Sequence, residues 1–231
     1  MRFCHPKLLK IGCLTAVWGD RSSLDPMGLD LQYFGTLRPM LYHGTASVNL
    51  ASIRSTRVLT SAALLAPDRR HAVRSAEVIV KTDQHVIALR DQLALRQGHV
   101  ELTGGWYRRD LIAALNSRVF FWPGDQNGPN GYGRHFFDAY RRRGHKPTML
   151  RVHFFDLLKA NPDAQPYFCR FNSGAPRTSG GRKSPRGPDT FQDAGAWEGS
   201  PSRVAEVSFV SKVLLPRSTE VWDHAAGWQS L

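Results

Sequence analysis

Leu41-Tyr42-His43-Gly44-Thr45 is the stretch of this sequence on which the fold assignment depends. Residues 38–43 have the pattern of a short strand, and Gly44 lets the chain turn and lets a ligand approach the backbone closely. A histidine at the tip of a strand can hydrogen-bond the hydroxyl groups of a ligand such as a ribose, and Thr45 offers a further hydroxyl. A structural histidine beside a turn glycine has the same pattern, so the surrounding segments must distinguish the two.

The elements predicted around this stretch are short and of both kinds. A helix is expected over residues 46–55, capped by Thr45 or Ser47, and another from Thr60-Ser61 to Leu65. Further helices are predicted at 109–116, 134–143 and 155–160, and strands at 118–122, 149–153, 204–210 and 213–215.

The segments between these elements favour an α+β fold. Pro123-Gly124 is expected to end a strand, residues 125–133 to form a loop, and residues 69–99 are mixed and basic. Regular βαβ units are not found. Neither GxGxxG after a strand nor GxxxxGK[ST] is present, which excludes the Rossmann and P-loop interpretations.

Glu206 is the unusual residue of a late predicted strand. Alternation places Val204, Glu206 and Ser208 on one face, and Ala205, Val207 and Phe209 on the other. A charge is costly to bury without a partner. Glu206 therefore either faces a cleft or lies on an edge strand in solvent.

These segments together resemble the opening of the ADP-ribosyltransferase fold, as in poly(ADP-ribose) polymerases and DNA-targeting toxins. The resemblance rests on Leu41 to Thr45, then Asn49-Leu50, Ser52-Ile53 and Val58-Leu59. In those families a strand ending in His-Gly-Ser/Thr or a variant is followed by Asn-Leu, a helix and a short apolar turn. Their usual Gly-Leu is Val58-Leu59 here, so Arg57 before it must tolerate a turn where glycine is common.

The resemblance implies a split sheet with short helices around an NAD cleft, and catalysis by Glu206 and His43. The residues that it implies for NAD binding are Tyr42, His43, Gly44, Thr45, Asn49, Arg90, Trp122 and Tyr140. Arg90, in the polar triplet Arg90-Asp91-Gln92, is preferred to Arg118 as the pyrophosphate ligand. Trp122, Tyr132 and Tyr140 are alternatives for stacking on nicotinamide, and Phe120 and Trp122 could equally be plain core.

Residues 173–202 are expected to form a flexible loop, because Ser, Gly, Pro and Arg dominate and few aliphatic residues are present. In many relatives, a loop in this position recognises the target. Its candidate contacts with substrate are Arg177, Arg182, Lys183, Arg186 and Phe191, and Arg141-Arg142-Arg143, Phe171 and Trp197 could add to them. Basic and aromatic side chains together favour a single nucleic-acid strand. The net charge of +12 agrees with a phosphate-bearing partner.

The sequence as a whole therefore predicts an NAD-dependent mono-ADP-ribosyltransferase, a glycosyltransferase with NAD as donor. It would modify a nucleic-acid base, with DNA favoured, as a toxin or defence enzyme that has an antitoxin or immunity protein as partner. The alternatives are an NAD-dependent RNA 2′-phosphotransferase, a protein-targeting ADP-ribosyltransferase, and an inactive nucleic-acid-binding module.

The 231 residues are divided into an N-terminal extension, 1–37, and one domain, 38–231, expected to be a monomer. No apolar run approaches the roughly 18 residues of a membrane helix. Lys10 interrupts the apolar part of residues 7–14, which argues against a signal peptide. Cys4, Cys13 and Cys169 form no CxxC pair, so no metal site or disulfide framework is expected, and a reducing cytoplasm fits best.

Overall fold

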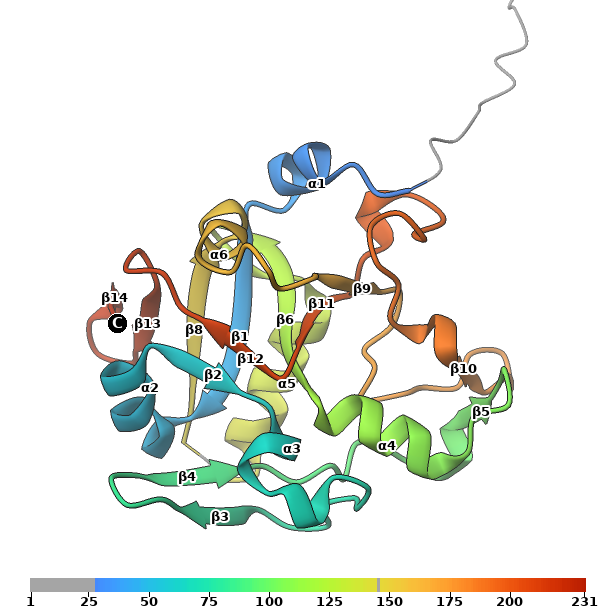
Figure 1. Cartoon of the computed structure of the whole chain (residues 1–231), viewed down its shortest axis with the longest axis horizontal. Helices are drawn as coiled ribbons and strands as arrows, with labels where there is room; N and C mark the ends of the chain where they lie inside the picture. Colours follow the sequence, from blue (N-terminus) through green and yellow to red (C-terminus); the bar gives the residue numbers. More distant parts are fainter. Residues whose placement is uncertain (1–27, 145) are drawn as a thin grey trace, which may run out of the picture.

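The computed structural model describes residues 28–144 and 146–231. Its centre is an antiparallel sheet with the strand order β14-β13-β8-β1-β6-β11-β9, and β7 pairs with β6 (Figure 1). The strands of this sheet are β1 (Met40–Ala46), β6 (Arg118–Asp125), β7 (Gly128–Pro129), β8 (Pro147–His153), β9 (Tyr167–Cys169), β11 (Glu206–Val210), β13 (Glu220–Asp223) and β14 (Gly227–Ser230). With its short helices, the sheet confirms the α+β class.

Three two-stranded ribbons lie around the central sheet. The antiparallel ribbons are β2 (Val58–Thr60) with β12 (Lys212–Leu214), and β3 (Val78–Lys81) with β4 (Val86–Leu89). The parallel ribbon is β5 (Val100–Leu102) with β10 (Ser184–Arg186). Strands β3 and β4 lie in the range 69–99, where no strand was predicted, because both are half exposed and basic residues surround them.

The helices are short. They are α1 (Leu31–Leu37), α2 (Leu50–Thr56), α3 (Ala62–Leu65), α4 (Arg108–Asn116), α5 (Gly131–Arg142) and α6 (Phe154–Ala160), with 3-10 turns η1 (Ser47–Asn49), η2 (Pro67–Arg69), η3 (Gln97–His99), η4 (Pro188–Thr190) and η5 (Pro201–Arg203). Helices α1 and α6 lie at one end of the sheet, and α3 with the β3–β4 ribbon lies at the other (Figure 1). No helix in the described part of the chain is long and apolar enough to cross a membrane.

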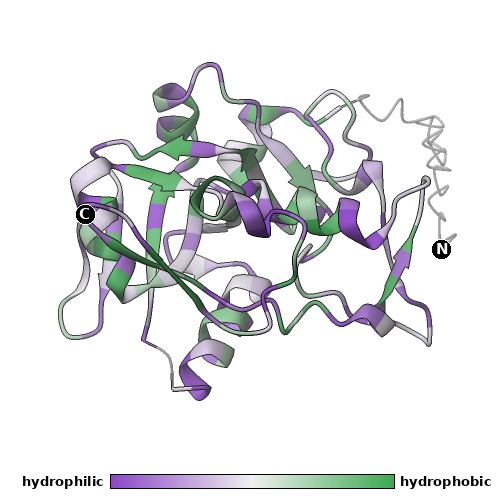
Figure 2. Cartoon of the chain, turned by 60° about the horizontal axis from the view of Figure 1, so that its bottom comes forward, coloured by the Kyte–Doolittle hydropathy of each residue, from purple (hydrophilic) through white to green (hydrophobic). Residues whose placement is uncertain are grey.

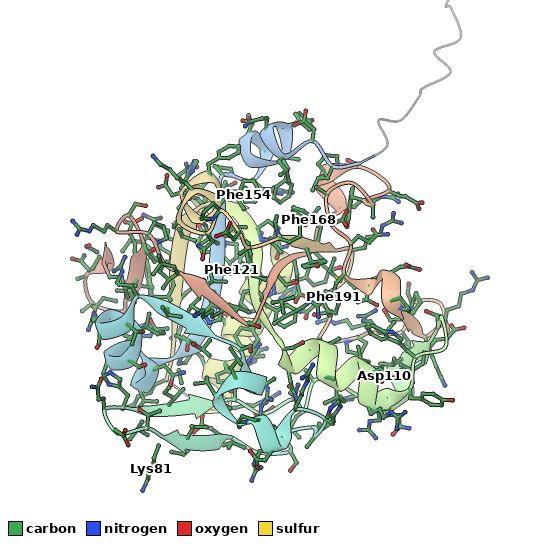
Figure 3. All side chains as sticks on the ribbon, viewed as in Figure 1. Lys81, Asp110, Phe121, Phe154, Phe168 and Phe191 are labelled. Carbon is green, nitrogen blue, oxygen red and sulfur yellow. The ribbon has the colours of Figure 1, made fainter. Side chains whose placement is uncertain are left out.

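The main core lies on one face of the sheet. Phe34 of α1, Phe154 of α6 and Phe168 of β9 are fully buried, and Phe34 meets the other two rings edge to face. Phe121 of β6 meets Phe209 of β11 in the same way. Phe121, Phe154 and Phe168 are labelled in Figure 3. In Figure 2 hydrophobic residues (green) are frequent along the central strands, whereas hydrophilic residues (purple) are frequent in outer loops and at helix ends. Helix α1, within the predicted extension 1–37, thus packs into the core, and residues 1–27 lie outside the described part.

Several predicted boundaries differ from the observed ones. The strand at 118–122 continues through Pro123-Gly124 to Asp125, because Gly124 is needed where β7 approaches: a Cβ there would lie 2.2 Å from the Gly128 carbonyl oxygen. Helix α5 begins at Gly131 rather than 134, since the Asn130 side chain accepts a hydrogen bond from the Gly133 N–H at 3.2 Å.

The late strand begins at Glu206 rather than 204. Alternation holds from that point, with Val207 and Phe209 in the main core. Val204, predicted to share the face of Glu206, instead joins the main core because it precedes the strand. Arg57 has the left-handed backbone conformation (φ 55°) at the end of α2, as its position in place of a glycine predicted.

Candidate active site

Strands β1 and β6 separate in the middle of the sheet. They pair from Met40 to Tyr42, opposite Gly124 to Trp122, and there the register ends. Beyond that point β1 continues along β8 only, while β6 pairs with β11 through Phe121 to Arg118. The two strands therefore diverge within one sheet, and the residues after Tyr42 face an opening.

A cavity of about 640 Å³ occupies this opening. Its size lies within the range of small-molecule and cofactor sites. Side chains from both faces of the sheet line it, among them Leu59 on the core side and Phe136 of α5 on the other. The predicted residues that line it are His43, Gly44, Thr45, Asn49, Arg90, Trp122, Tyr132, Tyr140, Arg177 and Glu206.

His43 spans the opening. Its Nδ1 lies 2.9 Å from the carbonyl oxygen of Phe120 on β6. A carbonyl only accepts, so Nδ1 carries the proton and Nε2 presents its lone pair. Burial lowers the pKa of His43 to about 4, the Phe120 carbonyl opposes this, and the charge of Arg90 adds to it. The imidazole is therefore neutral at neutral pH and can accept a hydrogen bond from a hydroxyl group.

Glu206 is 3% exposed and lies on β11, between β6 and β9, which rules out the edge strand in solvent. The N–H and the Oγ–H of Ser173 both donate to its Oε2, at 2.9 and 2.5 Å. No residue in the described ranges donates to Oε1, so that oxygen is left for a ligand. Burial raises the pKa of Glu206, whereas the Ser173 bonds and the charges of Arg186 and Arg90 lower it.

Arg90 presents a cation to the cavity. Its guanidinium lies over the Phe136 ring, 4.0 Å from the ring centre, and donates no hydrogen bond to any residue among 28–144 and 146–231. Burial lowers the pKa of Arg90 from its usual value, against the charges of Tyr140, Glu206 and Asp91. Arg118 differs, because its Nη1 donates to the Ala114 carbonyl at 3.0 Å and its guanidinium covers the Phe191 and Tyr167 rings.

A buried polar group fixes the segment that carries Arg90. The Asn116 side chain accepts from Arg74 Nη1 at 2.8 Å and from Gln92 Nε2 at 2.9 Å, and it donates to carbonyls of the turn at 69–72. Arg74 Nε in turn donates to the Arg90 carbonyl at 2.9 Å. The backbone of Arg90 is thus determined by protein contacts while its guanidinium is left for a ligand.

Gly44, Thr45 and Asn49 have structural roles at the cavity wall. A Cβ on Gly44 would lie 2.8 Å from the Phe136 ring, so glycine is required for α5 to pack there. Asn49 Nδ2 donates to Thr45 Oγ1 at 2.9 Å and to the Ala88 carbonyl at 3.0 Å, and Asn49 Oδ1 accepts from the Ala88 N–H. The Asn49 amide therefore connects η1 to β4, and its donors are used within the protein.

The three aromatic candidates for stacking differ in exposure. Trp122 and Tyr140 are buried and flank Phe136, whose ring centre lies 4.8 Å from that of Trp122 and 5.2 Å from that of Tyr140. Burial raises the pKa of Tyr140 to about 12. Tyr132, at the start of α5, is 43% exposed and also lines the cavity. Tyr132 therefore has the accessible ring, and the other two form the wall.

Tyr42 does not line the cavity, although the resemblance implied a contact with NAD. Alternation along β1 points it to the face opposite His43, where it is fully buried with Met40 and Met149. Its hydroxyl donates to the Asp125 carbonyl. Tyr42 thus connects β1 to the β6–β7 hairpin.

The predicted substrate loop has two kinds of residue. Arg177 is exposed and lines the cavity, and Arg182 and Lys183 are exposed beyond it. Arg186 and Phe191 are buried, at 1% and 7% exposure, so neither can contact a nucleic acid from this conformation. Trp197, 1% exposed, packs against Phe168. The burial of these large side chains within the Ser- and Gly-rich segment was not predicted.

Ser173 and Tyr132 are the further residues at the site. Ser173 was assigned only to the loop, and Tyr132 was one alternative among three aromatic residues. A motif search has no signal for Ser173, because its role depends on its distance from Glu206, 33 residues away. No group of three or more His, Cys, Asp or Glu suited to a metal ion occurs in the described part of the chain.

Comparison with protein families gives one match. The family model covers residues 39–219 and is described as a family of unknown function (DUF7002). No curated protein matches the chain. The matched range contains both diverging strands, His43, Arg90 and Glu206. Because it spans most of the 231 residues, the chain belongs to the DUF7002 family.

Proposed function

We propose that this protein is an NAD-dependent mono-ADP-ribosyltransferase with His43 and Glu206 as its catalytic residues. One observation carries the proposal. The neutral imidazole of His43 on β1, the Glu206 carboxylate on β11 and the Arg90 guanidinium line the same cavity, and in the described part of the chain neither Glu206 Oε1 nor the guanidinium has a hydrogen-bond partner. These three groups suit three features of NAD: the imidazole suits a ribose hydroxyl, the carboxylate suits the positive charge that develops on the sugar, and the guanidinium suits the pyrophosphate.

The binding part of the proposal assigns one role to each group. His43 Nε2 accepts a hydrogen bond from a ribose hydroxyl. The Arg90 guanidinium binds the pyrophosphate, since its planar donors match phosphate oxygens. Tyr132 offers its exposed ring for stacking on the nicotinamide. Each neutral hydrogen bond contributes only about 0.5–1.5 kcal/mol net, so its effect is mainly on orientation.

The catalytic part concerns Glu206. NAD supplies a glycosidic bond whose cleavage releases nicotinamide with the bonding electron pair and leaves positive charge on the ribose. Glu206 Oε1 stabilises that charge inside a buried site, where an oriented carboxylate acts more strongly than in water. The acceptor then forms the new bond to the sugar and loses its proton, and the raised pKa of Glu206 suits it to receive that proton.

For the acceptor we propose a nucleic-acid base, with DNA favoured, and a toxin or defence role. Cations outnumber acids at the cavity, which is lined by Arg74, Arg90, Arg118, Arg143, Arg177 and Lys212 but only by Asp91 and Glu206 as acids. Asp91 is paired with Arg143 at 3.2 Å. A negatively charged nucleic-acid strand is therefore favoured at the entrance over a partner whose surface is cationic or has few acidic groups. Arg177, Arg182 and Lys183 remain exposed for its phosphates.

The function is tested with NAD that is labelled in its adenosine part, by measuring transfer of the label to an acceptor. The protein is incubated in parallel with single-stranded DNA, RNA and mixed protein. We expect label on DNA, and a loss of about 10²–10⁴-fold in Glu206→Gln. The matched control is Glu101→Gln, an exposed glutamate on β5, which should keep full activity. Full activity in Glu206→Gln would contradict the assignment.

The same experiment distinguishes the alternatives. Label on mixed protein alone would favour a protein-targeting transferase. NAD-dependent removal of a 2′-phosphate from RNA, insensitive to Glu206→Gln, would favour the phosphotransferase. Binding of oligonucleotides with no consumption of NAD would favour an inactive binding module. A toxin role predicts that the wild type slows growth of an expression host more than Glu206→Gln does.

A further inference from the structure

Arg186 is one of only two charged residues that are buried in the described part of the chain, and the other is Glu206. No carboxylate pairs with the Arg186 guanidinium within the described ranges. Burying a cation is costly unless its donors are satisfied. The acceptors that bind the Arg186 N–H groups therefore indicate the role of this residue.

The Arg186 donors go to the chain beside Glu206. Nη2 donates to the Asn172 carbonyl at 3.0 Å and Nε to the Ser173 carbonyl at 3.5 Å. Nη1 donates to Ser184 Oγ at 2.6 Å and to the Pro185 carbonyl at 2.7 Å. The guanidinium also lies over the Phe171 ring, 4.7 Å from its centre. Two consecutive carbonyls, at 172 and 173, are thus bound by one rigid group.

Ser173 connects that group to the carboxylate. Its carbonyl accepts from Arg186, while its N–H and its hydroxyl both donate to Glu206 Oε2. Ser173 is 1% exposed, so no water competes for these bonds from the surface. The orientation of Glu206, and which of its oxygens is free, depends on where this residue is placed.

We infer that Arg186 is a positioning residue for Glu206: it fixes the Asn172-Ser173 backbone so that both Ser173 donors bind Oε2 and Oε1 faces the substrate. The catalytic meaning of this inference rests on the proposed function, whereas the positioning itself does not. It also replaces the role predicted for Arg186, which was to contact the acceptor. Arg182 and Lys183, four and three residues earlier, are exposed and keep that role.

The first test needs no enzymatic activity. The titration of Glu206 is followed by NMR of the full chain carrying ¹³C-labelled glutamate, with Glu206→Gln identifying the signal. The hydrogen bonds from Ser173 and the charges of Arg90 and Arg186 favour the ionised form of the Glu206 carboxylate, whereas burial favours the protonated form. Cys169 on β9 is the neighbouring titratable group. Arg186→Lys keeps the charge but lacks the planar donors, so an upward shift of the titration is expected.

Two variants make this result interpretable. Ser173→Ala removes one donor to Oε2 and should shift the titration in the same direction. Arg182→Lys makes the same chemical change at an exposed site and should leave it unmoved. If Arg186→Lys does not fold, Arg186→Gln, which keeps an amide donor without the charge, takes its place. An unchanged titration in the folded Arg186 variant would overturn the inference.

The second test is a double-mutant comparison of NAD-dependent transfer. Arg186→Lys should lower kcat about 10- to 100-fold, the scale of hydrogen bonds to a charged group, with KM for NAD nearly unchanged. In the Glu206→Gln background the same substitution should cause no further loss, because the group it positions is gone. Equal losses in both backgrounds would indicate a general structural role instead. Absence of transfer in the wild type would refute the proposed function and leave the titration result standing.

Discussion

His43 shows how one side chain can couple pH to stability. The fold lowers its pKa from 6.5 to about 4, mainly through burial, so the unfolded chain binds its proton first as pH falls. The stabilising effect of the neutral imidazole is complete above pH 6.5 and is lost as pH falls towards 4. A shift of this size corresponds to roughly 3 kcal/mol of unfolding free energy.

The prediction is therefore a difference in pH dependence between the wild type and His43→Gln. Urea unfolding at a series of pH values from 7 to 4 should show a smaller loss of stability in the variant, since glutamine does not titrate. His153→Gln, at a histidine outside the cavity lining, is the control and should follow the wild type. Parallel curves for all three proteins would contradict the neutral state of the half-buried His43.

Glu206 should affect the pH dependence of stability in the direction opposite to His43, because its pKa is raised rather than lowered in the folded protein. Burial raises the pKa of Glu206 in the folded protein. The protonated side chain therefore stabilises the fold fully below the usual pKa of a glutamate, and this stabilisation is lost as pH rises through the raised pKa. Glu206→Gln should accordingly increase the unfolding free energy at pH 7 by roughly 0.5–2 kcal/mol, and the increase should shrink in acid. Thermal unfolding at pH 7 and pH 4.5 measures both. A variant less stable than the wild type at pH 7 would contradict this.

At the scale of the element, α2 ends on a residue that would ordinarily be glycine. Arg57 has φ 55° and donates hydrogen bonds to the carbonyls of Leu231, at 2.9 Å, and of Pro216. The side chain offsets the backbone cost by connecting the helix to two later segments. The resemblance located this turn correctly, but the partners lie more than 150 positions away and no local pattern indicates them.

This arrangement predicts an order of stability for three variants. Arg57→Ala keeps the backbone strain and loses both bonds, so it should be the least stable. Arg57→Gly loses the bonds but relieves the strain, and should exceed Arg57→Ala by about 1 kcal/mol. Arg54→Ala, on the exposed side of the same helix, should resemble the wild type. Urea unfolding at neutral pH gives the order, and equal values for the alanine and glycine variants would contradict it.

The elements also show what can and cannot be predicted from this sequence. The runs of apolar residues that form β1 and β8 could be located because both faces of these strands are buried, although β1 runs on through Gly44 instead of turning there. Helix α4 could be located because its apolar residues form one buried face. The apolar pattern failed for β3 and β4, which bury little, and at Pro123-Gly124, where tertiary contact overrides a local stop signal. The resemblance singled out His43, and a charge within a predicted strand singled out Glu206; both line the cavity. Ser173 and Arg186 could not be identified, because only folding brings them to Glu206.

On the scale of the whole molecule, the positive charge has a measurable consequence. If single-stranded DNA is bound by Arg177, Arg182 and Lys183, each substitution by alanine should weaken binding and reduce the slope of log affinity against log salt by about 0.7. Lys159→Ala, on α6 and outside the cavity lining, should change neither. Fluorescence anisotropy at several salt concentrations measures this, and equal slopes for all variants would exclude these cations as phosphate contacts.

The separation of β1 from β6 has a consequence for the dynamics of the protein. Past Tyr42 the edge of β1 that faces β6 pairs with no strand among the described residues, so the amide groups on that edge lack the protection that a continuous sheet gives. A molecule in the opening contacts both strands and acts as the missing neighbour. Amide hydrogen exchange at residues 43–46 and 118–121 should therefore slow when NAD is added. If NAD is the substrate, as proposed, its binding would join the two strands and release of the product would separate them again.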